Sequence, residues 1–279
     1  HFHHTDDGLN YYVNDDKSFW RVVNFVDSIT FNTSDDLRVI ELTGKAFGQF
    51  QTQLSDFDGS LLYETIPDFH NMRKRLDTLF LHVAEDPCSR VKEVKNEVDY
   101  ISSVRDEASL LSVMFENGEI PKRVTHNDTK LNNILFDDET NEGICVIDLD
   151  TIMPGFSLYD FGDAIRFGGN TTREDDDNLD NVKISLELFE SYAEGFLSAS
   201  AKALTMAEVE NLAFSAMLMP LECGIRFLTD YLDGDVYFRT HYAEHNLVRA
   251  RNQFKLVYEI EQHMDEMNRI VMDIYNKYI

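Results

Sequence analysis

The residues best suited to chemistry lie in a polar stretch near the middle of the chain, His126-Asn127-Asp128-Thr129-Lys130-Leu131-Asn132-Asn133. Asp128 precedes Asn133 by five residues. In phosphoryl transfer, an aspartate and an asparagine at this spacing accept the proton of the attacking hydroxyl and hold Mg²⁺ respectively. The stretch therefore predicts an active site in which Asp128 is the base and Asn133 a metal ligand.

A second acid, Asp148, stands at the end of the apolar run Gly143-Ile144-Cys145-Val146-Ile147. Such a run predicts a buried strand. Ile134-Leu135-Phe136 and the acidic stretch after it predict an earlier strand and a turn, and so a hairpin that returns Asp148 to Asn133. Carboxylate and amide oxygens are suitable Mg²⁺ ligands, and Asp150 is predicted to share the metal.

Three further residues complete this predicted constellation. Lys130, two residues after Asp128, can offset the charge of a transferring phosphoryl group, although a solvated loop lysine is the alternative. His126 is interpreted as a scaffold residue that packs and hydrogen-bonds within the loop. Asp160, in Tyr159-Asp160-Phe161-Gly162-Asp163, is interpreted as a structural acid.

The spacing of the motifs argues against a protein substrate. Only eleven residues lie between Asp148 and Asp160, too few for the activation segment of a protein kinase. The motifs resemble those of the aminoglycoside phosphotransferase and choline kinase superfamily. The resemblance is closer to the N-acetylhexosamine 1-kinases, and it is carried by 126–133, by Val146-Ile147-Asp148-Leu149-Asp150-Thr151 with Met153-Pro154-Gly155, and by 159–166.

The resemblance implies a protein-kinase-like α+β fold and a definite reaction. The γ-phosphoryl group of ATP would pass, with Mg²⁺, to the anomeric hydroxyl of N-acetylglucosamine or N-acetylgalactosamine. A glycine-rich phosphate loop and a strand lysine are expected in the small lobe of such a kinase, and neither occurs upstream of Asp128. We therefore expect residues 1–32 to be a truncated remnant of the β-rich lobe, residues 33–279 to form the helical lobe, and the fragment itself to be inactive.

The remnant is expected to contain two strands, Tyr11-Tyr12-Val13 and 19–26, joined by an Asp-rich turn. The second would lead into a hinge whose backbone meets adenine through Phe25, Val26, Asp27 and Ser28. An edge hairpin that binds no ligand is the alternative.

The acceptor pocket is expected in the C-terminal helices. Arg226 lies at the apolar end of a predicted helix, four residues before Asp230. One interpretation is an ion pair between the two. Under the resemblance, Arg226 donates hydrogen bonds to the sugar or its N-acetyl carbonyl, while Tyr237 packs on the ring.

Other functions remain open at this stage. A kinase of another small alcohol, such as an amino alcohol, an aminoglycoside or a different sugar, uses the same motifs. A silent sugar- or nucleotide-binding module is a further alternative. Sulfate-ester hydrolysis is excluded, because the surroundings of Cys88 do not match the nucleophile motif of sulfatases.

Composition limits the partners and the compartment. The net charge of −26 disfavours nucleic acid and anionic lipid. No uninterrupted apolar run approaches the eighteen residues of a membrane helix. Three widely spaced cysteines indicate neither a disulfide framework nor a zinc site. We expect a cytoplasmic protein that binds a small sugar, with a monomer favoured.

Apolar spacing predicts the helices of the large lobe. Asp35 or Ser34 is expected to cap the first, and Pro67 to begin the second. A long helix closed by Gly118 is then expected, followed by three more after the motifs; the expected ranges are 37–54, 67–83, 91–115, 182–197, 206–228 and 246–275.

Overall fold

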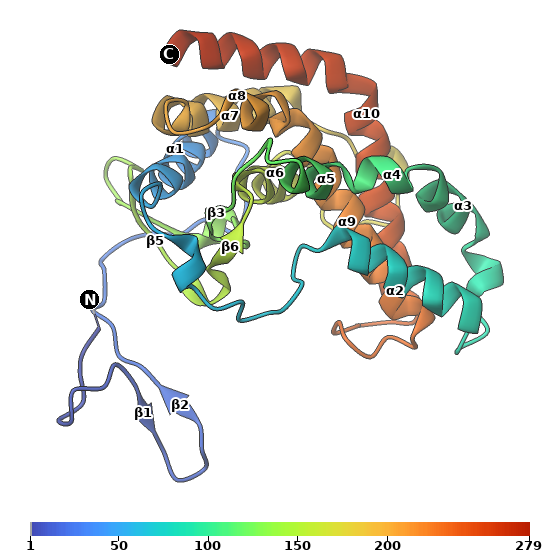
Figure 1. Cartoon of the computed structure of the whole chain (residues 1–279), viewed down its shortest axis with the longest axis horizontal. Helices are drawn as coiled ribbons and strands as arrows, with labels where there is room; N and C mark the ends of the chain where they lie inside the picture. The colour runs from blue at the N-terminus through green and yellow to red at the C-terminus, as the bar shows by residue number, and fades with distance from the viewer. Residues whose placement is uncertain (1) are drawn as a thin grey trace.

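The N-terminal segment stands apart from the rest of the molecule. The computed structural model describes residues 2–279, and its first two strands, β1 (Tyr12–Val13) and β2 (Phe19–Trp20), form an antiparallel hairpin that projects away from the helices (Figure 1). The second strand is shorter than the sequence predicted. It ends because the chain beyond Trp20 pairs with other partners, Val23 with Phe2 and Ile29 with Phe136.

The segment that holds the catalytic motifs forms two small antiparallel pairs, β3–β6 and β4–β5. The predicted hairpin after Asn133 is confirmed, with Ile134 opposite Val146. Unlike the expectation, its second strand is only half-buried, since Ile144 remains 47% exposed. The bounds are β3 Arg123–Thr125, β4 Ile134–Phe136, β5 Gly143–Val146 and β6 Met153–Gly155.

Helices make up most of residues 33–279 and surround these strand pairs (Figure 1). Asp36 caps the first of them by accepting a hydrogen bond from Arg38 N–H. The helices are α1 Leu37–Gln53, α2 Met72–Glu85, α3 Lys95–Ser103, α4 Arg105–Ala108, α5 Leu110–Glu116, α6 Ser157–Gly168, α7 Leu186–Ser200, α8 Met206–Glu210, α9 Leu212–Leu232 and α10 His245–Tyr278.

Two glycines allow α1 and α7 to pack with their backbones in contact. A Cβ atom at Gly44 would lie 2.2 Å from the carbonyl oxygen of Tyr192, and one at Gly195 would lie 1.8 Å from that of Glu41. Both distances are far below any allowed contact, so these positions accept only glycine at this helix separation. The pair forms one side of the buried core that supports the catalytic loop.

Three expected helices differ from the structure. The one expected over 206–228 is divided at Asn211 into α8 and α9. Helix α2 begins at Met72, where the side chain of Asn71 accepts from Lys74 N–H, so the prediction that Pro67 starts it is wrong. The long helix expected over 91–115 is broken into α3, α4 and α5, with Val104 and Ser109 at the breaks. The breaks change the direction of the apolar face so that Ile101, Ala108 and Leu111 are all buried in the core.

Helix α9 is the one helix within residues 2–279 that is long and apolar enough, on average, to cross a membrane. Polar residues such as Glu222 and Asp230 interrupt its apolar sequence. Within the fold, 83% of its apolar window is buried. The helix packs against α10, α6 and α2, which is the position of a core helix.

Candidate active site

His126 fixes the catalytic loop to the strand that precedes Asp148. Its ring is buried and meets the rings of Phe47 and Phe50 edge-on. Nε2 lies 2.9 Å from the carbonyl oxygen of Ile147, and Nδ1 lies 3.3 Å from the backbone nitrogen of Asp128. A neutral imidazole with its proton on Nε2 satisfies both contacts. The ring thus ties the backbone of Asp128 to the end of β5.

Asp160 anchors the same loop from the opposite side. Its fully buried carboxylate accepts hydrogen bonds from the backbone N–H of His126 (2.9 Å), the backbone N–H of Asn127 (2.7 Å) and the side-chain amide of Gln51. Burial raises the pKa of Asp160, and these donors together with His126 oppose that rise. Asp160 therefore contacts the loop backbone rather than the space in front of Asp128.

Asp128, Lys130 and Asn133 lie in direct contact. The amide nitrogen of Asn133 donates to the Asp128 backbone carbonyl (2.8 Å) and to Asp128 Oδ2 (3.0 Å). Lys130 Nζ lies 2.7 Å from Asp128 Oδ1. The Asp128 side chain remains 23% exposed. A carboxylate held in this way is oriented and accessible, as a general base must be.

The structure places Asp148 beside Asn133, as the hairpin predicted. Ile147 N–H donates to the Asn133 carbonyl at 2.9 Å, and Asp148 adopts a left-handed conformation with φ of 59°. Within residues 2–279 neither the Asp148 carboxylate nor Asn133 Oδ1 has a hydrogen-bond or ion-pair partner. Two unpartnered oxygen donors on adjacent segments fit a hard cation such as Mg²⁺.

Asp150 is engaged differently. It forms an ion pair with Arg21 of the N-terminal segment, and both side chains are more than half exposed. Its backbone carbonyl accepts from Thr65 Oγ1. Among residues 2–279 no three His, Cys, Asp or Glu side chains cluster as a metal site, so a cation here would depend on Asn133 and on water in addition to carboxylates.

A cavity of about 390 Å³ opens directly beside Asp128. We call it the Asp128 cavity. Its walls come from the catalytic loop, α6, α9, the segment before α2 and the segment after α9. The residues that line it are Phe69, His70, Asn127, Asp128, Lys130, Asp163, Arg166, Phe167, Glu174, Met219, Glu222, Cys223, Arg226, Phe227, Phe238, Arg239 and Arg249.

Arg226 lines this cavity as the sequence predicted, and it is not paired with Asp230. Asp230 instead accepts three backbone N–H groups of residues 236–238 and the amide of Asn246. The ion-pair interpretation is therefore wrong. The Arg226 guanidinium lies over the rings of Phe69 (5.3 Å) and Phe238 (5.4 Å).

Tyr237 does not line the Asp128 cavity. It is 71% exposed and borders a separate cavity of about 180 Å³ on the far side of Arg226. The reason lies in the turn after α9. The N–H groups of residues 236–238 donate to Asp230, and this turn directs residue 238 inward and residue 237 outward. Phe238 therefore takes the place in the Asp128 cavity that the sequence analysis gave to Tyr237.

Glu222 and His70 form a buried pair in the cavity wall that sequence reasoning missed. Glu222 is 2% exposed, and its two oxygens lie 3.1 and 3.3 Å from His70 Nδ1. Burial alone would raise the pKa of Glu222, but the facing His70, with Arg226 and Arg75, holds it below its ordinary value. An acid one turn before Arg226 in an apolar helix was the available signal.

Four phenylalanines line the Asp128 cavity, and each ring is in cation–π contact with a lysine or arginine of the protein. Arg226 covers Phe69 and Phe238, and Arg249 lies 5.3 Å from the centre of Phe227. Phe167 meets Lys130 at 5.2 Å and Arg166 at 3.8 Å. The lining also contains five Lys or Arg residues and four acids. Positive charge is thus concentrated here although the chain as a whole is strongly negative.

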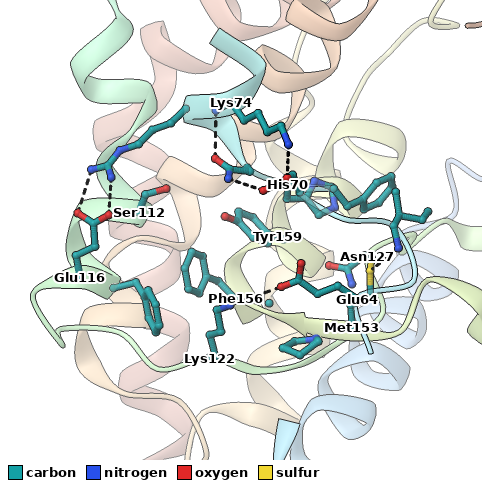
Figure 2. A pocket seen from close by; sticks show the side chains of 18 of the residues that line it. Glu64, His70, Lys74, Ser112, Glu116, Lys122, Asn127, Met153, Phe156 and Tyr159 are labelled. Carbon is teal, nitrogen blue, oxygen red and sulfur yellow. Dashed lines mark hydrogen bonds and ion pairs between the residues drawn. The ribbon is translucent and has the colours of Figure 1, made fainter. Parts of the chain in front are cut away.

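A second cavity of about 420 Å³ adjoins the first and shares Phe69, His70 and Asn127 with it. We call it the aromatic cavity. Figure 2 shows it between the segment before α2, the C-terminal part of α5 and β6. Phe156 and Tyr159 lie along its base with ring centres 5.0 Å apart and ring planes tilted by 42°.

The predicted hinge residues lie away from both cavities. Phe25 is 89% exposed, while Ser28 Oγ donates to the carbonyl of Val26. Val26, Asp27 and Ser28 form an extended link to Ile29, whose backbone exchanges two 2.9 Å hydrogen bonds with Phe136 of β4. This contact joins the N-terminal segment to the catalytic hairpin.

The model of the phosphotransferase enzyme family matches residues 2–194, which include every catalytic motif. Among solved structures, ethanolamine kinase of Plasmodium vivax has a TM-score of 0.54 at 14% identity and covers 89% of this chain and 67% of its own. Choline kinase of Cryptosporidium parvum Iowa II has a TM-score of 0.50 at 13% identity, covering 92% and 75%. An aminoglycoside phosphotransferase of Alicyclobacillus acidocaldarius has a TM-score of 0.50 at 12% identity, covering 95% and 77%.

These similarities establish the α+β kinase-like fold. The match of the family model over most of the chain agrees with the catalytic loop, the hairpin and the cavity beside Asp128. The chain belongs to the phosphotransferase enzyme family.

Proposed function

We propose that the protein transfers the γ-phosphoryl group of ATP to the anomeric hydroxyl of an N-acetylhexosamine. The observation that carries the acceptor class is the Asp128 cavity, whose four aromatic rings are all covered by cations of the protein itself. In such a cavity, an uncharged sugar ring meets many hydrogen-bond donors. A cationic acceptor would find no aromatic ring free to bind its charge. Asp128 at its wall supplies the base.

In the proposed reaction, Asp128 accepts the proton of the anomeric hydroxyl as that oxygen attacks the γ-phosphorus. The new oxygen–phosphorus bond forms while the bond between the γ-phosphorus and the β,γ-bridging oxygen breaks, and ADP leaves with that electron pair. Lys130 lies beside Asp128 and would partly neutralise the transferring group. The sugar 1-phosphate and ADP are the products.

Asn133 and Asp148 are the residues proposed to hold Mg²⁺, with Asp150 as a further ligand once its ion pair with Arg21 opens. When bound, the ion would neutralise charge on the β- and γ-phosphate oxygens. On the nucleotide side, the backbone of Phe25, Val26, Asp27 and Ser28 is proposed to meet adenine. We further propose that the protein acts in the cytoplasm as a monomer.

Arg226 and Glu222 offer complementary groups to an acetamido substituent. Both line the Asp128 cavity one helical turn apart on α9. Arg226 can donate to the acetamido carbonyl, and the buried Glu222 carboxylate, which has one protein donor in His70, can accept from the acetamido N–H. A sugar without that group would leave Arg226 without this acceptor and Glu222 with His70 alone, and an unmade hydrogen bond costs about 1–3 kcal/mol for a neutral group and more for a charged one.

A kinase of an amino alcohol is the alternative, and two of the similar structures are kinases of ethanolamine and choline. The buried Glu222 would suit an ammonium group. Against this alternative, an ammonium ion would enter beside Arg226, Arg239 and Arg249 and find no uncovered aromatic ring. A silent binding module is disfavoured by the accessible, oriented Asp128.

The acceptor is identified by assaying N-acetylglucosamine, N-acetylgalactosamine, glucose and choline side by side, with ³¹P NMR to locate the phosphate. We expect both N-acetyl sugars to react at the anomeric oxygen and glucose to react at least tenfold more slowly. Arg226→Ala is expected to remove most of the preference for the N-acetyl sugar. Phosphate on another carbon, or choline as the best acceptor, would contradict the proposed acceptor.

A further inference from the structure

The aromatic cavity has the character of a ligand site. Phe156 and Tyr159, 6% and 8% exposed, form its base, and Phe115 continues the aromatic surface 5.5 Å from Phe156. The hydroxyl groups of Tyr159 and Ser112 have no hydrogen-bond partner among residues 2–279, and Figure 2 shows Tyr159 between His70 and Phe156 at the centre of the cavity. The Tyr159 hydroxyl is open to the cavity and is therefore a donor that a ligand can use.

The charges around the aromatic cavity are paired with one another. Arg73 lies 2.5 Å from Glu116, Lys74 lies 2.5 Å from Asp68, and Lys122 lies 4.0 Å from Glu64. Figure 2 shows Glu116, Lys74, Lys122 and Glu64 around the rim. Because each lysine or arginine in the lining already has an acidic partner, the cavity presents no excess charge to attract an ion. It offers an aromatic base and a rim of polar groups, which suits the apolar face and the hydroxyls of a neutral sugar ring.

The position of the aromatic cavity links it to the reaction. Asn127, the residue before the proposed base, lines both cavities, as do Phe69 and His70. These three residues form a wall common to both cavities, so a sugar unit in the aromatic cavity would lie across that wall from an acceptor in the Asp128 cavity. The reducing-end anomeric carbon of an oligosaccharide must face Asp128, and the remainder must extend away from it.

We propose that the aromatic cavity is a second saccharide subsite and that the acceptor is a disaccharide whose reducing-end N-acetylhexosamine lies beside Asp128. This proposal rests on the proposed function, because it assumes an acceptor with a free anomeric hydroxyl. The second, neutral sugar unit packs on Phe156 and Phe115 and accepts a hydrogen bond from Tyr159. Ser112 and Lys122 supply further polar contacts at the rim.

The test compares N-acetylglucosamine with disaccharides that carry N-acetylglucosamine at the reducing end and a neutral hexose or N-acetylhexosamine at position 3 or 4. We expect kcat/KM to be at least tenfold higher for the preferred disaccharide. Tyr159→Phe, which removes one hydroxyl, and Ser112→Trp, which fills the cavity, are expected to lower the ratio of disaccharide to monosaccharide kcat/KM. Tyr192→Phe is the control, because it too removes a tyrosine hydroxyl without a hydrogen-bond partner but lies outside this cavity.

The outcomes separate this proposal from the proposed function. Phosphorylation of N-acetylglucosamine with rejection of every disaccharide, or an unchanged ratio in Tyr159→Phe, would overturn the second subsite alone. Failure to phosphorylate any N-acetylhexosamine would overturn the proposed function, and the subsite would then be judged by direct binding. Calorimetric titration of the disaccharide should in that case show weaker binding to Ser112→Trp than to the unaltered chain, and equal affinities would refute the subsite.

Discussion

The catalytic segment and the N-terminal segment are built in opposite ways. In the catalytic segment, His126, Asn127 and Asp160 are buried and joined through hydrogen bonds to backbone groups. In the N-terminal segment, Phe19 is 72% exposed and Trp20 61% exposed, and a hairpin of two-residue strands carries them. Residues 2–28 reach the catalytic residues chiefly through Arg21 and Asp150.

This difference separates the two halves of the proposed reaction. The acceptor side, with Asp128 and its cavity, is fixed by groups that α1, α6 and α9 hold in place. The nucleotide side depends on an exposed segment that contributes few buried contacts. Substitutions in the first region should therefore change both stability and turnover, whereas substitutions in the second should leave stability nearly unchanged.

The largest effect is expected at Asp128. In a form of the protein that also carries a glycine-rich loop and a strand lysine, Asp128→Asn should lower turnover by about 10²–10⁴-fold, the range for a positioned general base, with little change in nucleotide affinity. Asp148→Ala should abolish Mg²⁺-dependent nucleotide binding as well. Steady-state kinetics and nucleotide titration with and without Mg²⁺ measure the two effects. Asp137→Asn, in the exposed turn of the same hairpin, is the control. Turnover near that of the unaltered protein in Asp128→Asn would refute the proposed base.

The comparison between the two regions is tested directly by stability. Asp160→Ala leaves two buried backbone N–H groups and the Gln51 amide without an acceptor, so we expect a loss of about 3 kcal/mol or more in the free energy of unfolding. Trp20→Ser in the exposed hairpin should change it by no more than about 0.5 kcal/mol. Urea unfolding of both variants is the measurement. Equal losses would show that the N-terminal segment is as integral to the core as the catalytic loop.

The catalytic segment could be predicted well from sequence because its geometry is local. The spacing from Asn133 to Asp148 fixes a hairpin, and a hairpin has few ways to close. Much of helix α9 also followed from local pattern, whereas the position of Arg226 in a cavity wall followed from the resemblance and not from spacing. The exact breaks within 91–115 did not, because they depend on how Ile101 and Ala108 reach a core formed by distant helices.

The cavity chemistry was harder to predict because it depends on residues far apart in the chain. His70 meets Glu222 across 152 positions, and no periodicity indicates such a contact. The sequence analysis assigned Tyr237 to the cavity, but the structure places Phe238 there. The reason is that Asp230 accepts hydrogen bonds from the N–H groups of both residues, and the resulting turn directs Phe238 inward. Sequence patterns identified the helix that carries the site, but the inward-facing residue depends on tertiary hydrogen bonds.

The smallest predicted effect concerns Glu222 and pH. Its pKa in the folded protein lies below the ordinary value of 4.5 despite its burial. An acid with a depressed folded pKa stabilises the protein fully above its unfolded pKa, and this stabilisation is lost as the pH falls through the folded value. The charge-assisted contact with His70 should therefore make the unaltered protein more stable than Glu222→Gln by about 1 kcal/mol at neutral pH.

That difference in the free energy of unfolding should not decrease as the pH falls from about 8 to 5, and it should disappear only below the ordinary pKa of a glutamate. Urea unfolding of both proteins across this range measures it, and acceptor KM should stay constant because Glu222 keeps its charge. A difference that faded already between pH 7 and pH 5 would mean that burial dominates and raises the pKa. Glu222 would then be a proton donor at neutral pH, and its proposed contact with the acetamido N–H would have to be replaced by one with a carbonyl or hydroxyl oxygen.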